Sequence, residues 1–160
     1  MADLFPIAGQ KIFIGDATPS QADDFVAGDF SGITWVEIDG WATSGAAGDN
    51  ANLITQPLIN RGRDIKLKGT ANAGQMQNQF AVLAGDAGQE DLIAAAAASD
   101  KNNYAFKIEG NESGVTSVSQ RLFIGLVMSA SETGGDANTA RILDVTIEIN
   151  SNIVSVPAVA

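Results

Sequence analysis

Hydrophobic and polar residues alternate with a period of two in several stretches of the chain, which is typical of strands with one buried face. The clearest stretch is residues 141–150, RILDVTIEIN. Its apolar positions are Leu143, Val145, Ile147 and Ile149, and its polar positions are Asp144, Thr146, Glu148 and Asn150. Residues 63–70 and 103–110 alternate in the same way. The pattern therefore predicts three half-exposed strands.

Two other stretches are apolar on both faces. They are residues 121–128, RLFIGLVM, and residues 11–16, KIFIGD. Such runs are typical of strands buried between two layers or covered by a neighbouring chain. Further strands are expected at residues 33–41, 76–83 and 153–156, and residues 129–140 have the glycine content of a hairpin turn. The chain is thus predicted to be mainly β, with residues 1–160 in one domain.

One helix is expected at residues 87–99. Asp86 followed three residues later by Gln89 resembles a capping box, and Glu90 and Asp91 put negative charge at the positive end of the helix dipole. The Ala-rich segment that follows has a high helix propensity. Its small side chains allow another backbone to come close. The helix is therefore expected either on a sheet, in a contact between subunits, or across the end of its own barrel.

The segment at about residues 43–60 has the composition of a long loop with an apolar end. Loops of this length are uncommon in compact domains unless they have a function. We therefore expect this segment to dock on another subunit, and the alternative is an extra hairpin of the same domain. The residues expected to make this contact are Asp49, Asn50, Leu53, Ile54, Leu58 and Ile59.

Composition argues against catalysis and against binding to nucleic acid. The chain has no His, no Cys and one Tyr, so the usual general bases, thiol nucleophiles and soft metal ligands are missing. Nine basic and nineteen acidic residues give 9 − 19 = −10, a charge that repels a phosphate backbone. We expect no enzyme activity, no cofactor and no metal.

Targeting signals are also missing from the sequence. The first ten residues lack the basic and apolar blocks of a secretory signal, so we expect folding in a reducing cytoplasm. The longest uncharged apolar run, residues 92–98, is far shorter than the roughly 20 residues that span a bilayer. No membrane segment is expected.

The order of the segments resembles that of a known family. KIFIGD is followed by TWVEIDG, the long loop, an R-x-I-K-L-K-G strand and a D-A-G-Q-x-D-L helix. Y-x-F-K-I, F-I-G-L-V and a final D-V-T-I-E-I-N strand complete the series. Across nearly its whole length the chain resembles the major tail tube proteins of long-tailed, non-contractile bacteriophages.

This resemblance implies a β-sandwich or small barrel with one flanking helix. It implies a structural virion protein, assembled in the cytoplasm of a bacterial host, whose six-membered rings stack into a tube that conducts DNA during ejection. Each subunit would contribute strands to a ring-wide inner barrel, and the segment at 43–60 would reach the adjacent ring. The implied partners are further copies of the chain and the tape measure, tail terminator and distal tail proteins, while DNA passes without specific binding.

The acidic charge suggests which residues line such a tube. Six copies would carry 6 × (−10), or −60, and any share of it in the lumen would repel duplex DNA. We take Asp144, Thr146, Glu148 and Asn150 as candidates for the lumen-facing side. Lys66 and Lys68 do not fit an acidic lining, and we expect them to pair with acids across subunits.

Two other classes of protein fit parts of the pattern. A type VI secretion tube protein has a similar size and fold, although its usual amino-terminal strand pattern is missing here. A monomeric β-sandwich binding module would use Trp35 and Trp41 as exposed platforms for sugar rings, whereas aromatic residues more often fill a core or an interface. Rings or filaments would distinguish the tube proteins from the monomeric module.

Overall fold

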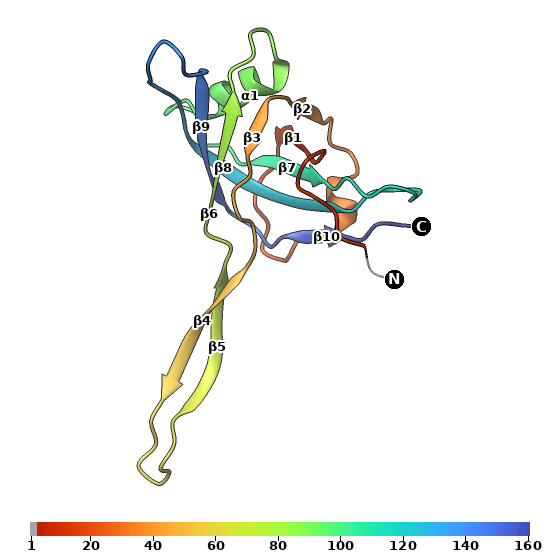
Figure 1. Cartoon of the computed structure of the whole chain (residues 1–160). Coiled ribbons are helices and arrows are strands. Elements are labelled where there is room, and N and C mark those ends of the chain that lie inside the picture. The colour runs from red at the N-terminus through yellow and green to blue at the C-terminus, as the bar shows by residue number, and fades with distance from the viewer. Residues whose placement is uncertain (1–2) are drawn as a thin grey trace.

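The computed structural model describes residues 3–160 as one curled antiparallel sheet, a separate two-stranded hairpin and one α-helix (Figure 1). The strand order is β2-β1-β7-β8-β9-β6-β3, and β10 also pairs with β8. The strands are β1 (Lys11–Ala17), β2 (Val36–Ile38), β3 (Trp41–Thr43), β4 (Asn50–Gln56), β5 (Ile65–Asn72), β6 (Gln75–Ala81), β7 (Tyr104–Glu109), β8 (Gln120–Thr133), β9 (Ile142–Ile149) and β10 (Val154–Val156). The helices are the 3-10 turn η1 (Ala27–Phe30) and α1 (Ala87–Ala95). The predicted mainly β fold with one flanking helix is confirmed.

The sheet curls until its two end strands come close to each other. β2 and β3 are at opposite ends of the strand order, yet only Asp39 and Gly40 separate them along the chain. Gly40 has a φ of +77°, and a Cβ there would lie 2.5 Å from the carbonyl oxygen of Ala81. Only glycine adopts this turn without strain. The single strand predicted at residues 33–41 is therefore wrong, because the turn divides it into two.

The inside of this curled sheet, which we call the barrel, is filled by apolar side chains from each of its strands except β10. Phe106 of β7 and Phe123 of β8 stack there, with ring centroids 5.6 Å apart. A smaller cluster covers the opposite face of these two strands: Phe25, Phe30, Ala105, Leu122 and Ile124. β8 is thus buried on both faces from Leu122 to Gly125, as the apolar run at residues 121–128 predicts, but Met128 at the end of that run is exposed.

The alternation predicted for β9 is confirmed by burial. Leu143, Val145, Ile147 and Ile149 are buried in the main core, whereas the side chains between them are partly exposed. β6 alternates in the same way, with Met76, Asn78 and Phe80 buried. β8 is longer than expected and continues to Thr133, so the turn before β9 is shorter than the predicted residues 129–140.

The helix α1 begins where the sequence predicts and ends earlier. The Asp86 carboxylate accepts a hydrogen bond from the backbone N–H of Gln89 at 3.0 Å, which is the predicted N-cap. The helix ends at Ala95, not Ser99, because Asp100 accepts hydrogen bonds from the Tyr104 hydroxyl and the Asn102 N–H and so turns the chain toward β7. Within residues 3–160, no helix is both long enough and apolar enough to cross a membrane.

Candidate assembly surfaces

The strands β4 and β5 leave the barrel together as a projecting hairpin (Figure 1). We call residues 50–72 the hairpin arm. Every residue of β4 is exposed, and β5 has only Ile65 and Gly69 partly covered. The prediction of a loop across residues 43–60 is therefore wrong for Asn50–Gln56, which form a strand. The hairpin that was the alternative does form, but it projects away from the barrel.

The residues predicted to make the contact between rings are spread along this arm. Asp49 lies at its base, Asn50, Leu53 and Ile54 are on β4, and Leu58 and Ile59 are in the turn at its tip. Ile59 is fully exposed, and Leu53 is 68% exposed. The structure thus brings these six residues into one element, although nothing in their own segment predicts its partner strand β5.

The hairpin arm has two unlike faces. Cross-strand partners share a face, so the more apolar face carries Ile54, Gln56, Ile65 and Leu67, and the other carries Leu53, Thr55, Lys66 and Lys68. Neither face is covered by the barrel. A two-stranded hairpin alone is marginally stable in water. The apolar face therefore gains stability if another molecule covers it.

The outer face of β9 and β6 is a polar surface. Asp144, Thr146 and Glu148 lie opposite Gln79, Gln77 and Gln75 in the register of the two strands. The structure brings together three of the four candidates for the lumen-facing side. Asn150 lies beyond the end of β9, where its side-chain amide donates a hydrogen bond to Asn103 Oδ1 at 3.0 Å.

The three glutamines of this surface were not among the residues predicted from the sequence. Residues 75–80 read Gln-Met-Gln-Asn-Gln-Phe, and the period of two was available to find them. Asn78, on the buried side, interrupts the apolar pattern. Its Oδ1 accepts hydrogen bonds from Trp41 Nε1 at 3.2 Å and from the Gly45 N–H at 2.9 Å, so this polar core residue positions the segment after β3.

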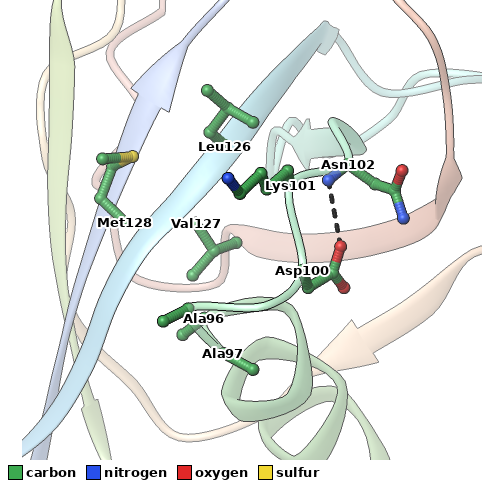
Figure 2. Close-up of a pocket in the computed structure, with 9 residues that line it drawn as sticks. Ala96, Ala97, Asp100, Lys101, Asn102, Leu126, Val127 and Met128 are labelled. Atoms are coloured by element: carbon green, nitrogen blue, oxygen red, sulfur yellow. Dashed lines mark hydrogen bonds between the residues drawn. The ribbon is translucent and has the colours of Figure 1, made fainter.

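The second half of β8 has an unpaired edge. β8 pairs with β9 from Gly125 to Thr133, but with β7 only as far as Gly125, so residues 126–133 have no strand partner on that side within residues 3–160. Beside this edge is a groove of about 320 Å³ between β8 and the turn after α1 (Figure 2). Met128 at the groove is 58% exposed. Such an edge can accept a strand from another chain.

The part of the chain that the structure describes contains no group of three or more metal-ligating side chains. Three carboxyl groups have lowered pKa values, each from a local hydrogen bond. The hydroxyls of Tyr104, Ser119 and Thr139 lower the pKa of Asp100, Glu112 and Asp136 respectively, and these contacts stabilise surface turns. They account for the shifts without a catalytic site.

The two tryptophans are not exposed platforms for sugar rings. Trp41 packs against the main core, and Trp35 packs against the smaller cluster around Phe25 and Phe30. The Lys107 ammonium lies 5.1 Å from the Trp35 ring centroid. The hypothesis of a monomeric binding module required both tryptophan rings to be exposed for binding sugar, and these packed positions do not agree with it.

The fold of this chain is similar to that of several solved structures. No protein-family model and no curated protein matches the chain. Solved structures do match it along almost its full length. A chain of the anti-feeding prophage baseplate, six-fold symmetrised, has a TM-score of 0.74 and 9% identity over 98% of both chains. A chain of the PVC sheath/tube terminator, from an extracellular contractile injection system, has a TM-score of 0.70 and 12% identity over 97% of this chain and 98% of the other.

A phage structure also matches. The SPP1 tail tube protein has a TM-score of 0.66 and 12% identity, over 97% of this chain and 81% of that one. At these identities the likeness concerns the fold. The chain therefore has the mainly β fold that is found in tube and terminator structures of phage tails and contractile injection systems.

Proposed function

We propose that the chain is a structural subunit of a tail-tube-like assembly, in which copies join laterally into rings and rings stack into a hollow tube. The observation that carries this proposal is that two surfaces have no partner in the part of the subunit that the structure describes. One is the edge of β8 at residues 126–133, and the other is the hairpin arm. The fold shared with tube and terminator structures supports the same function.

The lateral contact joins two different free edges of the sheet. The β8 edge at residues 126–133 is free on the side away from β9, and β3, at one end of the strand order, is paired with β6 only. Pairing the β8 edge of one copy with the β3 edge of the next would give a closed ring in which both of these edges are covered. We propose six copies in a ring, because one structural neighbour belongs to an assembly that is six-fold symmetrised.

The cargo and the location follow from the charge and from the resemblance to tail tubes. In this proposal Asp144, Thr146, Glu148 and Asn150 line the bore, together with the glutamines of β6. DNA passes without binding along a wall of acidic and uncharged polar side chains. The tube forms part of a virion assembled in the bacterial cytoplasm, in contact with tape measure, terminator and distal tail proteins. A tube of the secretion type is the second candidate, since contractile injection systems share the fold.

Negative-stain imaging and analytical ultracentrifugation of the purified protein test the proposed function. We expect rings or filaments whose proportion increases with protein concentration. A monomer at all concentrations would contradict the proposal and favour a solitary binding module.

A substitution at the β8 edge tests the lateral contact. Met128→Glu is expected to raise the concentration needed for ring formation about tenfold or more, because a buried and unpaired carboxylate costs several kcal/mol. Met128→Leu is the matched control and should assemble normally. Sedimentation velocity gives the distribution of species. Unchanged ring formation by the Glu variant would exclude this edge from the contact.

A unique cysteine tests the lumen, because the chain has none of its own. Thr146→Cys should react with a maleimide carrying a large polymer in the monomer and should be protected from it in filaments. A small maleimide should still react with the filaments, which distinguishes a bore from a buried interface. Mass spectrometry measures the extent of labelling. Equal reaction of filaments with both reagents would place Thr146 on the outer surface.

A further inference from the structure

The charge of the chain is divided unevenly between the hairpin arm and the rest of the molecule. Residues 50–72 contain Arg61, Arg63, Lys66 and Lys68 but only one acid, Asp64, which gives 4 − 1 = +3. The whole chain carries −10, so the remaining residues carry −10 − 3 = −13. Two copies that approach without their arms therefore repel each other, whereas an arm and the barrel of another copy attract each other.

The basic side chains of the arm make no ion pair among residues 3–160. The ion pairs among residues 3–160 join Lys107 with Glu109 and Arg141 with Glu132, and neither pair involves the arm. Arg61, Arg63, Lys66 and Lys68 are exposed. β4, which lies beside Lys66 and Lys68, carries no acid. Four cations are thus presented to solvent on an element that projects from the barrel.

Acidic side chains lie at the opposite end of the molecule. The helix α1 and the hairpin arm are at opposite ends in Figure 1. Glu90 and Asp91 on α1 and Glu37 on the adjacent β2 are exposed, and their side chains make no hydrogen bond or ion pair among the described residues 3–160. The part of the subunit that faces away from the arm therefore offers charge of the sign that the arm needs.

We propose that the hairpin arm of one copy docks on the acidic α1 end of a second copy, and that this charge pairing drives stacking and fixes its direction. The inference rests on the proposed function and adds its partner surface. Exposed ion pairs contribute little individually. In a ring, however, several arms act at once, and each also replaces a repulsion between acidic barrels with an attraction.

Salt gives the first test. Filaments of the unaltered protein should be abundant at about 0.05 M NaCl and should fall at least about tenfold at 1 M, where the Debye length is about 3 Å. Rings should persist at the higher salt, because the proposed lateral contact covers the exposed apolar side chain of Met128. Pelleting measures filaments, and sedimentation velocity measures rings.

A charge exchange gives the second test. One variant reverses the arm with Arg61→Glu, Arg63→Glu, Lys66→Glu and Lys68→Glu. The other reverses the acceptor with Glu90→Lys and Asp91→Lys. Each variant alone should form rings and lose at least about 90% of its filaments, since like charges now face each other. A mixture of the two should regain filaments, because each variant supplies the partner that the other lacks.

Two controls separate the possible outcomes. Asp3→Lys with Asp23→Lys changes the net charge as much as the acceptor variant does, outside α1, and should leave filaments unchanged. Fluorescence anisotropy with duplex DNA checks whether the arm binds nucleic acid instead. Three results would overturn the inference and leave the tube proposal intact. The first is equal stacking of rings at high salt, and the second is filament formation by either variant alone. The third is that reversing the arm mainly abolishes DNA binding. If the unaltered protein forms neither rings nor filaments, the proposed function fails, and the inference fails with it.

Discussion

Replacing residues 53–68 with an Asn-Gly turn is expected to abolish filaments and leave the barrel folded. The replacement removes most of the hairpin arm, which supplies no residue to either core cluster. The ends to be joined are already close, because a Cβ on Gly69 would lie 3.2 Å from the Asn52 carbonyl oxygen. Asn-Gly is a favoured two-residue turn between antiparallel strands. Electron microscopy should show rings without stacking.

Thermal unfolding provides the control for this truncation. The melting temperature should stay within a few degrees of that of the unaltered protein, because the buried core is retained. The truncation begins after Asn52 so as to retain Ala47, which packs against the main core. Filaments of normal length from the truncated protein would show that the arm is dispensable for stacking. A large fall in melting temperature would instead show that the barrel depends on the arm.

Gln89→Leu is expected to destabilise the monomer by about 3–5 kcal/mol, which is a large part of a typical folding free energy. The Gln89 side chain is 3% exposed and links three backbone groups. Its Nε2 donates to the carbonyl oxygens of Asp39 at 2.9 Å and Ala81 at 2.8 Å, and its Oε1 accepts from the Leu83 N–H at 3.1 Å. Leucine has a similar volume but removes the partner of all three backbone groups.

Chemical denaturation followed by circular dichroism measures this effect. Gln79→Leu is the matched control, because Gln79 is on the exposed face of β6 and should change the free energy of unfolding by less than about 0.5 kcal/mol. A Gln89 variant as stable as this control would mean that the barrel closes without the three hydrogen bonds. Assembly should weaken together with stability, since the same substitution loosens the junction between β2 and β3.

Gln89 shows that a local sequence motif can predict the start of a helix without predicting the tertiary contacts of its residues. The spacing of Asp86 and Gln89 predicts a capping box, and the Asp86 half of it forms. The Gln89 side chain does not return to the cap, because it bonds to groups that are distant in sequence, such as Asp39. A motif of four residues identifies the start of the helix. It contains no information on the strands that the curled sheet brings beside that helix.

The strands with one buried face were predictable, and the hairpin arm was not. β9 alternates because its inner residues reach a core, so its pattern records its surroundings. β4 has no buried face, and its sequence NANLITQ, with two Asn and no sustained alternation, is compatible with a loop. The alternation in β5 indicated a strand but not its partner. The apolar positions of β5 are exposed or only partly covered in the subunit, so the buried face predicted for residues 63–70 does not form within one copy.

The edge of β8 was also beyond prediction from the sequence. Residues 121–128 are apolar throughout, which indicated either a buried strand or cover by a neighbouring chain. In the structure, one part of this strand is buried within the subunit and another part is open to a neighbouring chain. Phe123 and Ile124 are buried, whereas Met128 is exposed beside an unpaired edge. Only the three-dimensional register shows where β7 stops and the open edge begins.

The placement of the hairpin arm and of α1 at opposite ends of the subunit has a consequence for growth (Figure 1). If the arm of each subunit docks on the α1 end of the next, every addition leaves one arm and one α1 end free at the two ends of the polymer. Such a polymer has no intrinsic stopping point. A tube of defined extent would therefore need its termination to come from a different molecule, one that occupies the last free arm or the last free helix end.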